Sequence, residues 1–302
     1  MRIVATFSAA RALARGRVGL VPTMGFFHEG HLSLMHEARR RCDTVLVSLF
    51  VNRLQFNDAA DFERYPRRAD RDAVLAAEAG VDLLFAPPPA EVYPEEPLTK
   101  VSVAGLTEIM EGPHRPGHFE GVAIVVTKLL AGLRPDVAFF GKKDAQQLAL
   151  VRRLVHDLSL PAAIVGCSTV READGLALSS RNVFLQPSDR PSALALSKGL
   201  LAAAAAVEKG ERRGAVLESI AAGEGGWRRA PGPRQEIEFD YCRLASQDRV
   251  EPMAVLDRPA FLGVAGRVGA VRLIDNVAFD GDDLRPDLGV RLRGRSLLYG
   301  EV

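Results

Sequence analysis

The sequence is poor in cysteine and in net charge. Its 302 residues include three cysteines, Cys42, Cys167 and Cys242, which lie far apart and form no C-x-x-C pair. This spacing excludes a disulfide framework and predicts a reducing compartment, the cytoplasm. Cys42 and Cys167 adjoin apolar strand-like runs, so we expect both thiols to be buried. The formal net charge of +1 argues against a nucleic-acid partner, because nucleic-acid binders are usually strongly basic.

Long apolar runs and two nucleotide-binding signatures are also missing. No run of about 20 apolar residues occurs, so we expect no transmembrane helix and no membrane partner. Arginines interrupt the first apolar segment, which predicts a short helix with Ser8 as its N-cap rather than a signal peptide. The sequence contains no G-x-x-x-x-G-K-[ST] and no G-x-G-x-x-G after its first strand. These absences exclude a P-loop and a dinucleotide fingerprint.

The first half of the sequence alternates apolar strands with helical patterns. The expected strands are residues 18–22, 44–51, 81–86, 136–141 and 162–167, and the expected helices are 31–41, 67–80, 119–133 and 145–158. Runs such as "TVLVSLFV" are apolar on both faces, as in a parallel sheet that helices cover on both sides. The pattern predicts an α/β fold with a Rossmann-like, doubly wound parallel sheet.

The pattern changes after about residue 170. It predicts alanine-rich helices in residues 197–222, a Gly/Pro-rich loop in "GEGGWRRAPGPR" (223–234), and antiparallel strands in "IEFDYCRLA" and "GAVRLIDNVAF". We therefore expect two domains. Residues 1–169 would form the Rossmann-like domain, and residues 170–302 a smaller α+β domain that closes over the site.

Polar clusters follow the strands of the first half at their carboxyl ends. They read "PTMGFFHEGH", "NRLQFN", "GKKDAQQ" and "STVREADGLALSSRN". Because the carboxyl ends of parallel strands meet at one edge, where doubly wound sheets bind ligands, these clusters predict one site.

His28 and His31 lie at the start of a predicted helix, with Gly30 between them. Their i, i+3 spacing puts them on one face of the first turn, where free N–H groups attract phosphate. Three interpretations stay open, namely phosphate binding, packing, or a zinc site completed by His114 and His118. The zinc interpretation is weakened because H-E-G-H is one residue shorter than H-E-x-x-H.

Six motifs resemble, in order, those of the pantothenate synthetase (pantoate–β-alanine ligase) family: "VPTMGFFHEGHLSL", "FVNRLQFN", "RYPR", "HRPGHFEGV", "FFGKKDAQQL" and "TVREADGLALSSRN". The resemblance covers nearly the whole chain. It implies a fold like that of class I aminoacyl-tRNA synthetases and other nucleotidyltransferases, and a homodimer. It also implies that pantoate and ATP, with Mg²⁺ bound to the ATP, form pantoyl-adenylate and pyrophosphate. The amine of β-alanine then displaces AMP to give pantothenate.

The resemblance implies roles for individual residues. The catalytic set around the ATP phosphates is His28, His31, Lys143, Ser179, Ser180 and Arg181. Further ATP contacts come from Pro22, Met24, Gly25, Gly30, Gly141, Asp144 at the ribose, Val170 and Leu178. Pantoate is bound by Met24, Gln55 and Gln147, and the β-alanine side is formed by Arg115 and His118. Asp72 corresponds to an acidic residue linked to Mg²⁺, directly or through water.

Several positions depart from the family pattern: Phe26, Phe27, Arg53, Arg71, Lys142 and Ala145. Lys142 stands where the family usually has Glu before the catalytic lysine, so two adjacent cations either act together on phosphate or point apart. None of the departures removes a residue assigned to the chemistry. Two other functions remain on the same fold, a non-catalytic nucleotide-binding module and a related nucleotidyltransferase. Gln55 and Gln147 favour the ligase.

Overall fold

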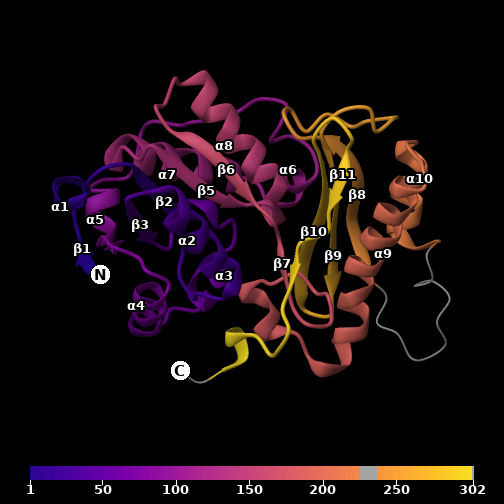
Figure 1. Cartoon of the computed structure of the whole chain (residues 1–302), viewed down its shortest axis with the longest axis horizontal. Helices are drawn as coiled ribbons and strands as arrows, with labels where there is room; N and C mark the ends of the chain where they lie inside the picture. Colours follow the sequence, from indigo (N-terminus) through magenta and orange to yellow (C-terminus); the bar gives the residue numbers. More distant parts are fainter. Residues whose placement is uncertain (225–236, 301–302) are drawn as a thin grey trace. The chain divides into compact units, whose positions relative to one another are not determined.

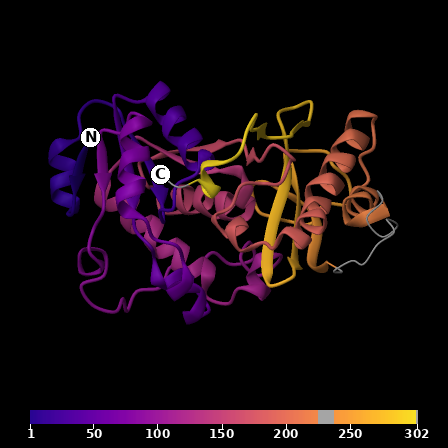
Figure 2. The same ribbon diagram turned by 90° about the horizontal axis from the view of Figure 1, so that it is seen from below.

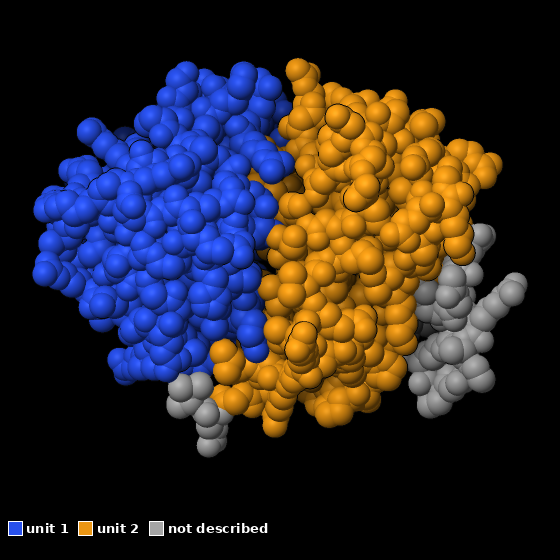
Figure 3. All heavy atoms as spheres, viewed as in Figure 1, with its two compact units in different colours: residues 1–141, 150–167, 302 blue, residues 142–149, 168–301 orange. Residues whose placement is uncertain are grey.

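The computed structural model describes residues 1–224 and 237–300, which group into two compact units coloured separately in Figure 3. Among the described residues, unit 1 holds 1–141 and 150–167, and unit 2 holds 142–149 and those from 168 to 300. The division at 169/170, with the roles given to the two domains, stays a prediction. The Gly/Pro-rich loop predicted at 223–234 lies almost entirely outside the described residues.

Unit 1 is built on a parallel sheet with the strand order β1-β4-β3-β2-β5-β6 (Figure 1). The strands are β1 (Arg2–Val4), β2 (Val18–Thr23), β3 (Thr44–Leu49), β4 (Leu83–Phe85), β5 (Val137–Gly141) and β6 (Ala163–Cys167). Five of the six were predicted, and the expected Rossmann-like class is confirmed. Strand β1 was not predicted, because three residues are too few to show a pattern.

Helices cover both faces of this sheet. The helical elements up to residue 157 are α1 (Phe7–Leu13), α2 (Glu29–Arg41), η1 (Arg53–Gln55), α3 (Ala59–Arg64), α4 (Ala69–Glu78), α5 (Pro89–Val92), α6 (Glu111–His114), α7 (His118–Leu133), η2 (Lys142–Asp144) and α8 (Ala145–Asp157). Helix α2 contacts α4, and α1 contacts α7. Right-handed crossovers place these two pairs on opposite faces. The N-cap of α1 is Thr6, whose hydroxyl accepts from the Ala9 N–H at 3.1 Å, so the prediction of Ser8 was wrong.

Unit 2 is built on an antiparallel sheet with the order β11-β10-β9-β8. The strands are β8 (Glu238–Ser246), β9 (Ala260–Val268), β10 (Val271–Asp280) and β11 (Arg285–Asp287), and β7 (Val170–Arg171) pairs with β12 (Val290–Arg291). The helical elements are η3 (Ser180–Phe184), η4 (Pro187–Asp189), α9 (Arg190–Glu208), α10 (Gly214–Ser219), η5 (Ile220–Glu224) and η6 (Leu297–Tyr299). Helix α9 packs on β9 and β10 (Figures 1 and 2), which closes the core of this unit.

The alanine-rich helices and both antiparallel strands predicted for the second half are present in unit 2. Within the described residues, every helix is too short or too polar to span a bilayer. All three cysteines are free. Cys42 is buried as expected, whereas Cys167 is only half-buried, because it is the last residue of β6 at the open edge of the sheet.

Candidate active site

The two histidines cap helix α2 by bonding to each other's main chain. His28 is the N-cap, and its Nδ1 accepts from the Gly30 N–H at 3.1 Å. The Nδ1 of His31 accepts from the His28 N–H at 3.3 Å, which completes a reciprocal capping box. A neutral imidazole that accepts at Nδ1 carries its proton on Nε2. Both rings therefore present an Nε2–H donor at a helix start, where anions bind well.

Gly30 is required by this cap. A Cβ at position 30 would lie 2.8 Å from Cε1 and 2.9 Å from Nδ1 of His28. Any side chain there would push the His28 ring out of its capping position. The ring centroids of His28 and His31 lie 4.2 Å apart. The two rings therefore pack against each other and also present their Nε2–H donors, so the packing interpretation and the phosphate interpretation are compatible.

A buried aspartate holds the loop that leads into the cap. The carboxylate of Asp72, in α4, accepts from the Phe26 and Phe27 N–H groups, each at 2.7 Å, and its residue has no exposed surface. Arg71 donates to the Phe27 carbonyl at 2.8 Å. Burial raises the pKa of Asp72, although the two amide hydrogen bonds and Arg71 act to lower it. Phe26 has φ of 54°, a conformation that is costly for a bulky residue and that the carboxylate here stabilises.

Met24, Gln55, Arg115 and His118 meet in one network of unit 1. The Gln55 Nε2 donates to Sδ of Met24 at 3.0 Å, and the Gln55 main-chain carbonyl accepts from His118 Nδ1 at 2.8 Å. A carbonyl only accepts, so His118 carries its proton on Nδ1. Its Nε2 then accepts from Arg115 Nη1 at 3.0 Å. The network fixes the orientation of the predicted pantoate and β-alanine residues in this unit.

Asn52 supports that network and was not predicted as a site residue. Its amide donates to Gln55 Oε1 at 3.1 Å and to the Gly121 carbonyl at 2.9 Å, while Tyr93 donates its hydroxyl proton to Asn52 Oδ1 at 3.0 Å. Asn52 is 1% exposed. Its position three residues before Gln55 in "FVNRLQFN" could have indicated a role beside that glutamine. Its partners Tyr93 and Gly121 are distant in the sequence, and no local pattern indicates them.

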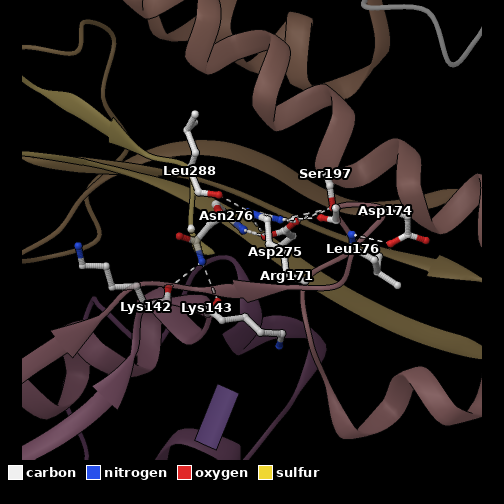
Figure 4. Close-up of polar contacts among 12 residues, drawn as sticks. Lys142, Lys143, Arg171, Asp174, Leu176, Ser197, Asp275, Asn276 and Leu288 are labelled. Carbon is white, nitrogen blue, oxygen red and sulfur yellow. Dashed lines mark hydrogen bonds and ion pairs between the residues drawn. The ribbon is translucent and has the colours of Figure 1, made fainter. Parts of the chain in front are cut away.

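In unit 2 the two adjacent lysines point apart (Figure 4). The Nζ of Lys142 donates to Asp280 Oδ2 at 2.6 Å and to Asp287 Oδ2 at 2.8 Å. Burial acts to lower the pKa of Lys142, but its hydrogen bonds to Asp280 and Asp287 outweigh burial and raise that pKa. Lys143 has no acidic partner among residues 1–224 and 237–300. Lys143 is thus the cation of this pair that can serve an anionic ligand.

Two of the remaining predicted ATP-contact residues of unit 2, Val170 and Leu178, pair in a tight hairpin that leads into Ser179–Arg181. The Leu178 N–H donates to the Val170 carbonyl at 2.9 Å, and Gly175 turns the chain with φ of +103°. Ser179 then caps η3, where its Oγ accepts from the Arg181 N–H at 3.3 Å. Asp144 is the last residue of η2, next to Lys143, and Gln147 lies in the first turn of α8; both are half-buried. The predicted residues of unit 2 thus lie in two segments, residues 143–147 and residues 170–181.

The zinc interpretation finds no support in these contacts. Within the part of the chain that the structure describes, no three His, Cys, Asp or Glu side chains group as metal ligands. The Nδ1 atoms of His28, His31 and His118 form hydrogen bonds with main-chain groups. These bonds orient the three rings and occupy one nitrogen of each.

Comparison with known proteins agrees with these motifs and this fold. Residues 2–278 match the family model described as pantoate-beta-alanine ligase. A pantothenate synthetase from Heliobacterium modesticaldum is 47% identical over 285 residues, 93% of this chain and 98% of the relative. One from Cereibacter sphaeroides is 52% identical over 261 residues, 86% of this chain and 91% of the relative.

Solved structures give the same result. The crystal structure of pantothenate synthetase from Thermus thermophilus has a TM-score of 0.84 at 47% identity and covers 91% of this chain and 98% of that one. A pantoate-beta-alanine ligase from Francisella tularensis, whose structure is described as a complex with beta-gamma ATP and beta-alanine, has a TM-score of 0.70 at 31% identity, with 91% and 97% coverage. The chain therefore belongs to the pantoate–β-alanine ligase family.

Proposed function

We propose that this chain joins pantoate to β-alanine at the expense of ATP through a pantoyl-adenylate. The pantoate carboxylate attacks the α-phosphorus, and the bond from phosphorus to the pyrophosphate oxygen breaks. The β-alanine amine then attacks the acyl carbon, AMP leaves with the bonding electron pair, and the amine loses a proton. The single observation that best supports the first step is the pair of Nε2–H donors that His28 and His31 form at the start of α2.

The first step accumulates negative charge on phosphate oxygens, so it needs fixed donors rather than a nucleophile from the protein. His28 and His31 donate through Nε2. Lys143 adds a full positive charge that no described carboxylate neutralises. Ser179, Ser180 and Arg181 contact the phosphates from the hairpin of unit 2, and residues 170–302 close over the nucleotide.

The other assignments belong to the same proposal. Gln55 and Gln147 bind pantoate through amides that both donate and accept, with Met24 beside them. Arg115 and His118 bind β-alanine, and the Arg115 guanidinium provides the positive charge that pairs with the carboxylate of β-alanine. Asp144 accepts from the ribose hydroxyls. Main-chain and packing contacts to ATP come from Pro22, Gly25, Gly30, Gly141, Val170 and Leu178.

Mg²⁺ is proposed to arrive on the ATP phosphates, as part of the substrate. Both oxygens of Asp72 accept main-chain N–H groups, and the residue has no exposed surface. Asp72 therefore does not fit a direct metal ligand, and we assign it to loop positioning. Octahedral Mg²⁺ keeps several waters and is commonly bound through substrate phosphates, which agrees with an ion that needs no resident ligand set.

We further propose a cytoplasmic homodimer with no nucleic-acid or membrane partner. Three unpaired thiols agree with a reducing compartment, and the dimer is supported by the family resemblance alone. Sedimentation at several protein concentrations tests it, since a monomer at every concentration would exclude a dimer.

The reaction is tested by assaying pyrophosphate and AMP. With ATP, Mg²⁺ and pantoate alone, the enzyme should release one pyrophosphate per site and exchange labelled pyrophosphate into ATP. Added β-alanine should release AMP and pantothenate in equal amounts. ATP binding without pyrophosphate release would indicate a non-catalytic module. Release of pyrophosphate without release of AMP when β-alanine is added would indicate another nucleotidyltransferase.

A further inference from the structure

A buried asparagine holds the main chain of the Lys143 segment within unit 2 (Figure 4). Asn276 lies in β10 and is 5% exposed. Its Nδ2 donates to the carbonyl oxygens of Lys142 at 2.8 Å and of Lys143 at 2.7 Å. Both amide protons of Asn276 are thereby used on two consecutive carbonyl groups, which fixes the peptide plane that joins the two lysines.

Asn276 is fixed in turn by a buried ion pair. The Asn276 N–H donates to Asp275 Oδ1 at 2.7 Å, and its carbonyl accepts from Arg171 Nη2 at 3.2 Å. Arg171 and Asp275 form a bidentate pair at 2.6 and 3.0 Å, and both side chains are 3% exposed. Ser197 donates a further hydrogen bond to Asp275 at 2.9 Å. A buried pair with its remaining oxygens satisfied holds one geometry and leaves little freedom to its neighbours.

The same arginine fastens the hairpin that carries the other phosphate-facing residues. Arg171 donates from Nη1 to the Gly175 carbonyl at 3.3 Å and from Nε to the Leu288 carbonyl at 2.8 Å. The Leu176 N–H, next to Gly175, donates to Asp174 at 3.2 Å. One array of hydrogen bonds therefore joins the Lys143 segment to the turn that precedes Ser179–Arg181.

We propose that Asn276 is a positioning residue for Lys143, and that the Arg171–Asp275 pair beneath it keeps the Lys143 segment and the 171–178 hairpin at a constant separation. This inference rests on the proposed function, in which Lys143 stabilises phosphate charge. Its physical basis is that a displacement of about 1 Å at a charge-stabilising group can cost about 10² in rate. None of these side chains needs to touch the substrate.

The test is a double-mutant cycle on single-turnover adenylate formation from ATP, Mg²⁺ and pantoate. Asn276→Ala should slow this step by about 10–100-fold, and Lys143→Ala should slow it by at least as much. In the Lys143→Ala background, Asn276→Ala should change the rate less than about threefold, because its effect acts through Lys143. Given ready-made pantoyl-adenylate and β-alanine, Asn276→Ala should keep most of its rate, since the pyrophosphate has already left.

Gln247→Ala is the matched control. Gln247 also donates from its amide to two main-chain carbonyls of unit 2, those of Ala260 at 3.1 Å and Phe279 at 3.2 Å, and to Asp280 Oδ1 at 2.8 Å. It makes no hydrogen bond to the main chain of Lys142 or Lys143, although Asp280 also accepts from the Lys142 side chain. It should lower the melting temperature to a similar degree as Asn276→Ala without the loss of rate. An equal loss of rate in both variants would mean that stability of the unit, not placement of Lys143, governs the step, and would overturn the proposal.

Two other outcomes also overturn it. One is an unchanged rate for Asn276→Ala, and the other is a full additional loss in the Lys143→Ala background. Lys143→Ala alone reports on the proposed function separately, because an unchanged rate there removes the role of Lys143 whatever Asn276 does. Should Asn276→Ala fail to fold, Asn276→Ser is used instead, since its hydroxyl keeps one donor for the two carbonyls. The same double-mutant cycle is then measured. The expected rates and the rates that would contradict the proposal are those given for Asn276→Ala.

Discussion

At the scale of single residues, His31 combines a structural and a chemical role. Its Nδ1 caps the helix, and its Nε2 supplies the donor that we assign to phosphate charge. Removing one such donor costs about 10²–10³ in rate. We expect His31→Ala to slow adenylate formation by about that factor, while the reaction of ready-made pantoyl-adenylate with β-alanine keeps most of its rate. Single-turnover measurement of each half-reaction checks this.

His31→Gln separates the two roles. Gln at the third helical position reaches back to the N-cap N–H in ordinary capping boxes, so this variant should recover the cap, which is worth about 1 kcal/mol. Its amide NH₂ still donates, but not from the position that the imidazole Nε2–H occupies, so adenylate formation should stay slow. Recovery of the rate together with stability would show that the cap alone mattered, and equal damage to both half-reactions would contradict a role in stabilising charge.

Gln55 allows a second test at this scale. Gln55→Ala removes an amide whose orientation Asn52 and Met24 fix, and leaving a substrate hydroxyl unpaired costs about 1–3 kcal/mol. We expect pantoate affinity to fall by that amount and ATP affinity to change little, and the same for Gln147→Ala. Calorimetric titration with each ligand measures both. Equal losses for the two ligands would reject the assignment.

At the scale of elements, the loop between β2 and α2 depends on Asp72. Asp72→Asn replaces one acceptor oxygen with an NH₂ group that faces a main-chain N–H. Hydrogen bonds to charged groups contribute about 1.5–3 kcal/mol, so we expect a loss of stability of about that size and weaker ATP binding. Urea denaturation and nucleotide titration measure the two effects.

The Mg²⁺ dependence distinguishes the two roles considered for Asp72. Higher Mg²⁺ should not restore ATP binding in Asp72→Asn, because the defect lies in the loop. Restoration by Mg²⁺ would instead support a metal-linked role. Asp70→Asn is the control, since Asp70 lies in the same first turn of α4 but is exposed, and it should leave ATP binding unchanged.

At the scale of the whole molecule, we expect the free energy of unfolding to fall at low pH as the Asp287 carboxylate becomes protonated. Burial acts to raise the pKa of Asp287, but hydrogen bonds from Lys142 and Ser168 outweigh it and lower the pKa from its ordinary value of 3.8. A carboxylate with a lowered folded pKa contributes stability that is fully present above its unfolded pKa. That contribution is lost as the pH falls from 3.8 through the folded pKa.

Asp287→Asn should therefore be less stable than the unmodified chain near neutral pH, and the difference should shrink as the pH falls below about 3.8. Denaturant titrations at a series of pH values measure it. Asp282→Asn, at an exposed position of the turn between β10 and β11, should show no such convergence. A stability difference between Asp287→Asn and the unmodified chain that stays constant down to about pH 2 would contradict a stabilising Lys142–Asp287 ion pair.

Local patterns in the sequence determined most of the elements and several of the contacts. The alternation of apolar runs with helical periodicity fixed five strands of the parallel sheet within a few residues, since burial on both faces leaves a continuous apolar run. The H-x-G-H cap is also local, because its bonds join residues two and three apart. The family motifs identified the chemistry, since each one keeps its functional side chains within a few positions along the chain.

Only the tertiary structure decided what holds those motifs in place. Asp72 binds the loop of Phe26 and Phe27 from 46 and 45 residues away. Asn276 binds the Lys143 carbonyl across 133 residues, and Lys142 reaches Asp280 across 138. Such partners leave no trace in local spacing, because tertiary packing of distant helices, strands and loops brings them together. That is why the sequence left open whether Lys142 acts with Lys143 on phosphate or points away, and its bonds to Asp280 and Asp287 decided this.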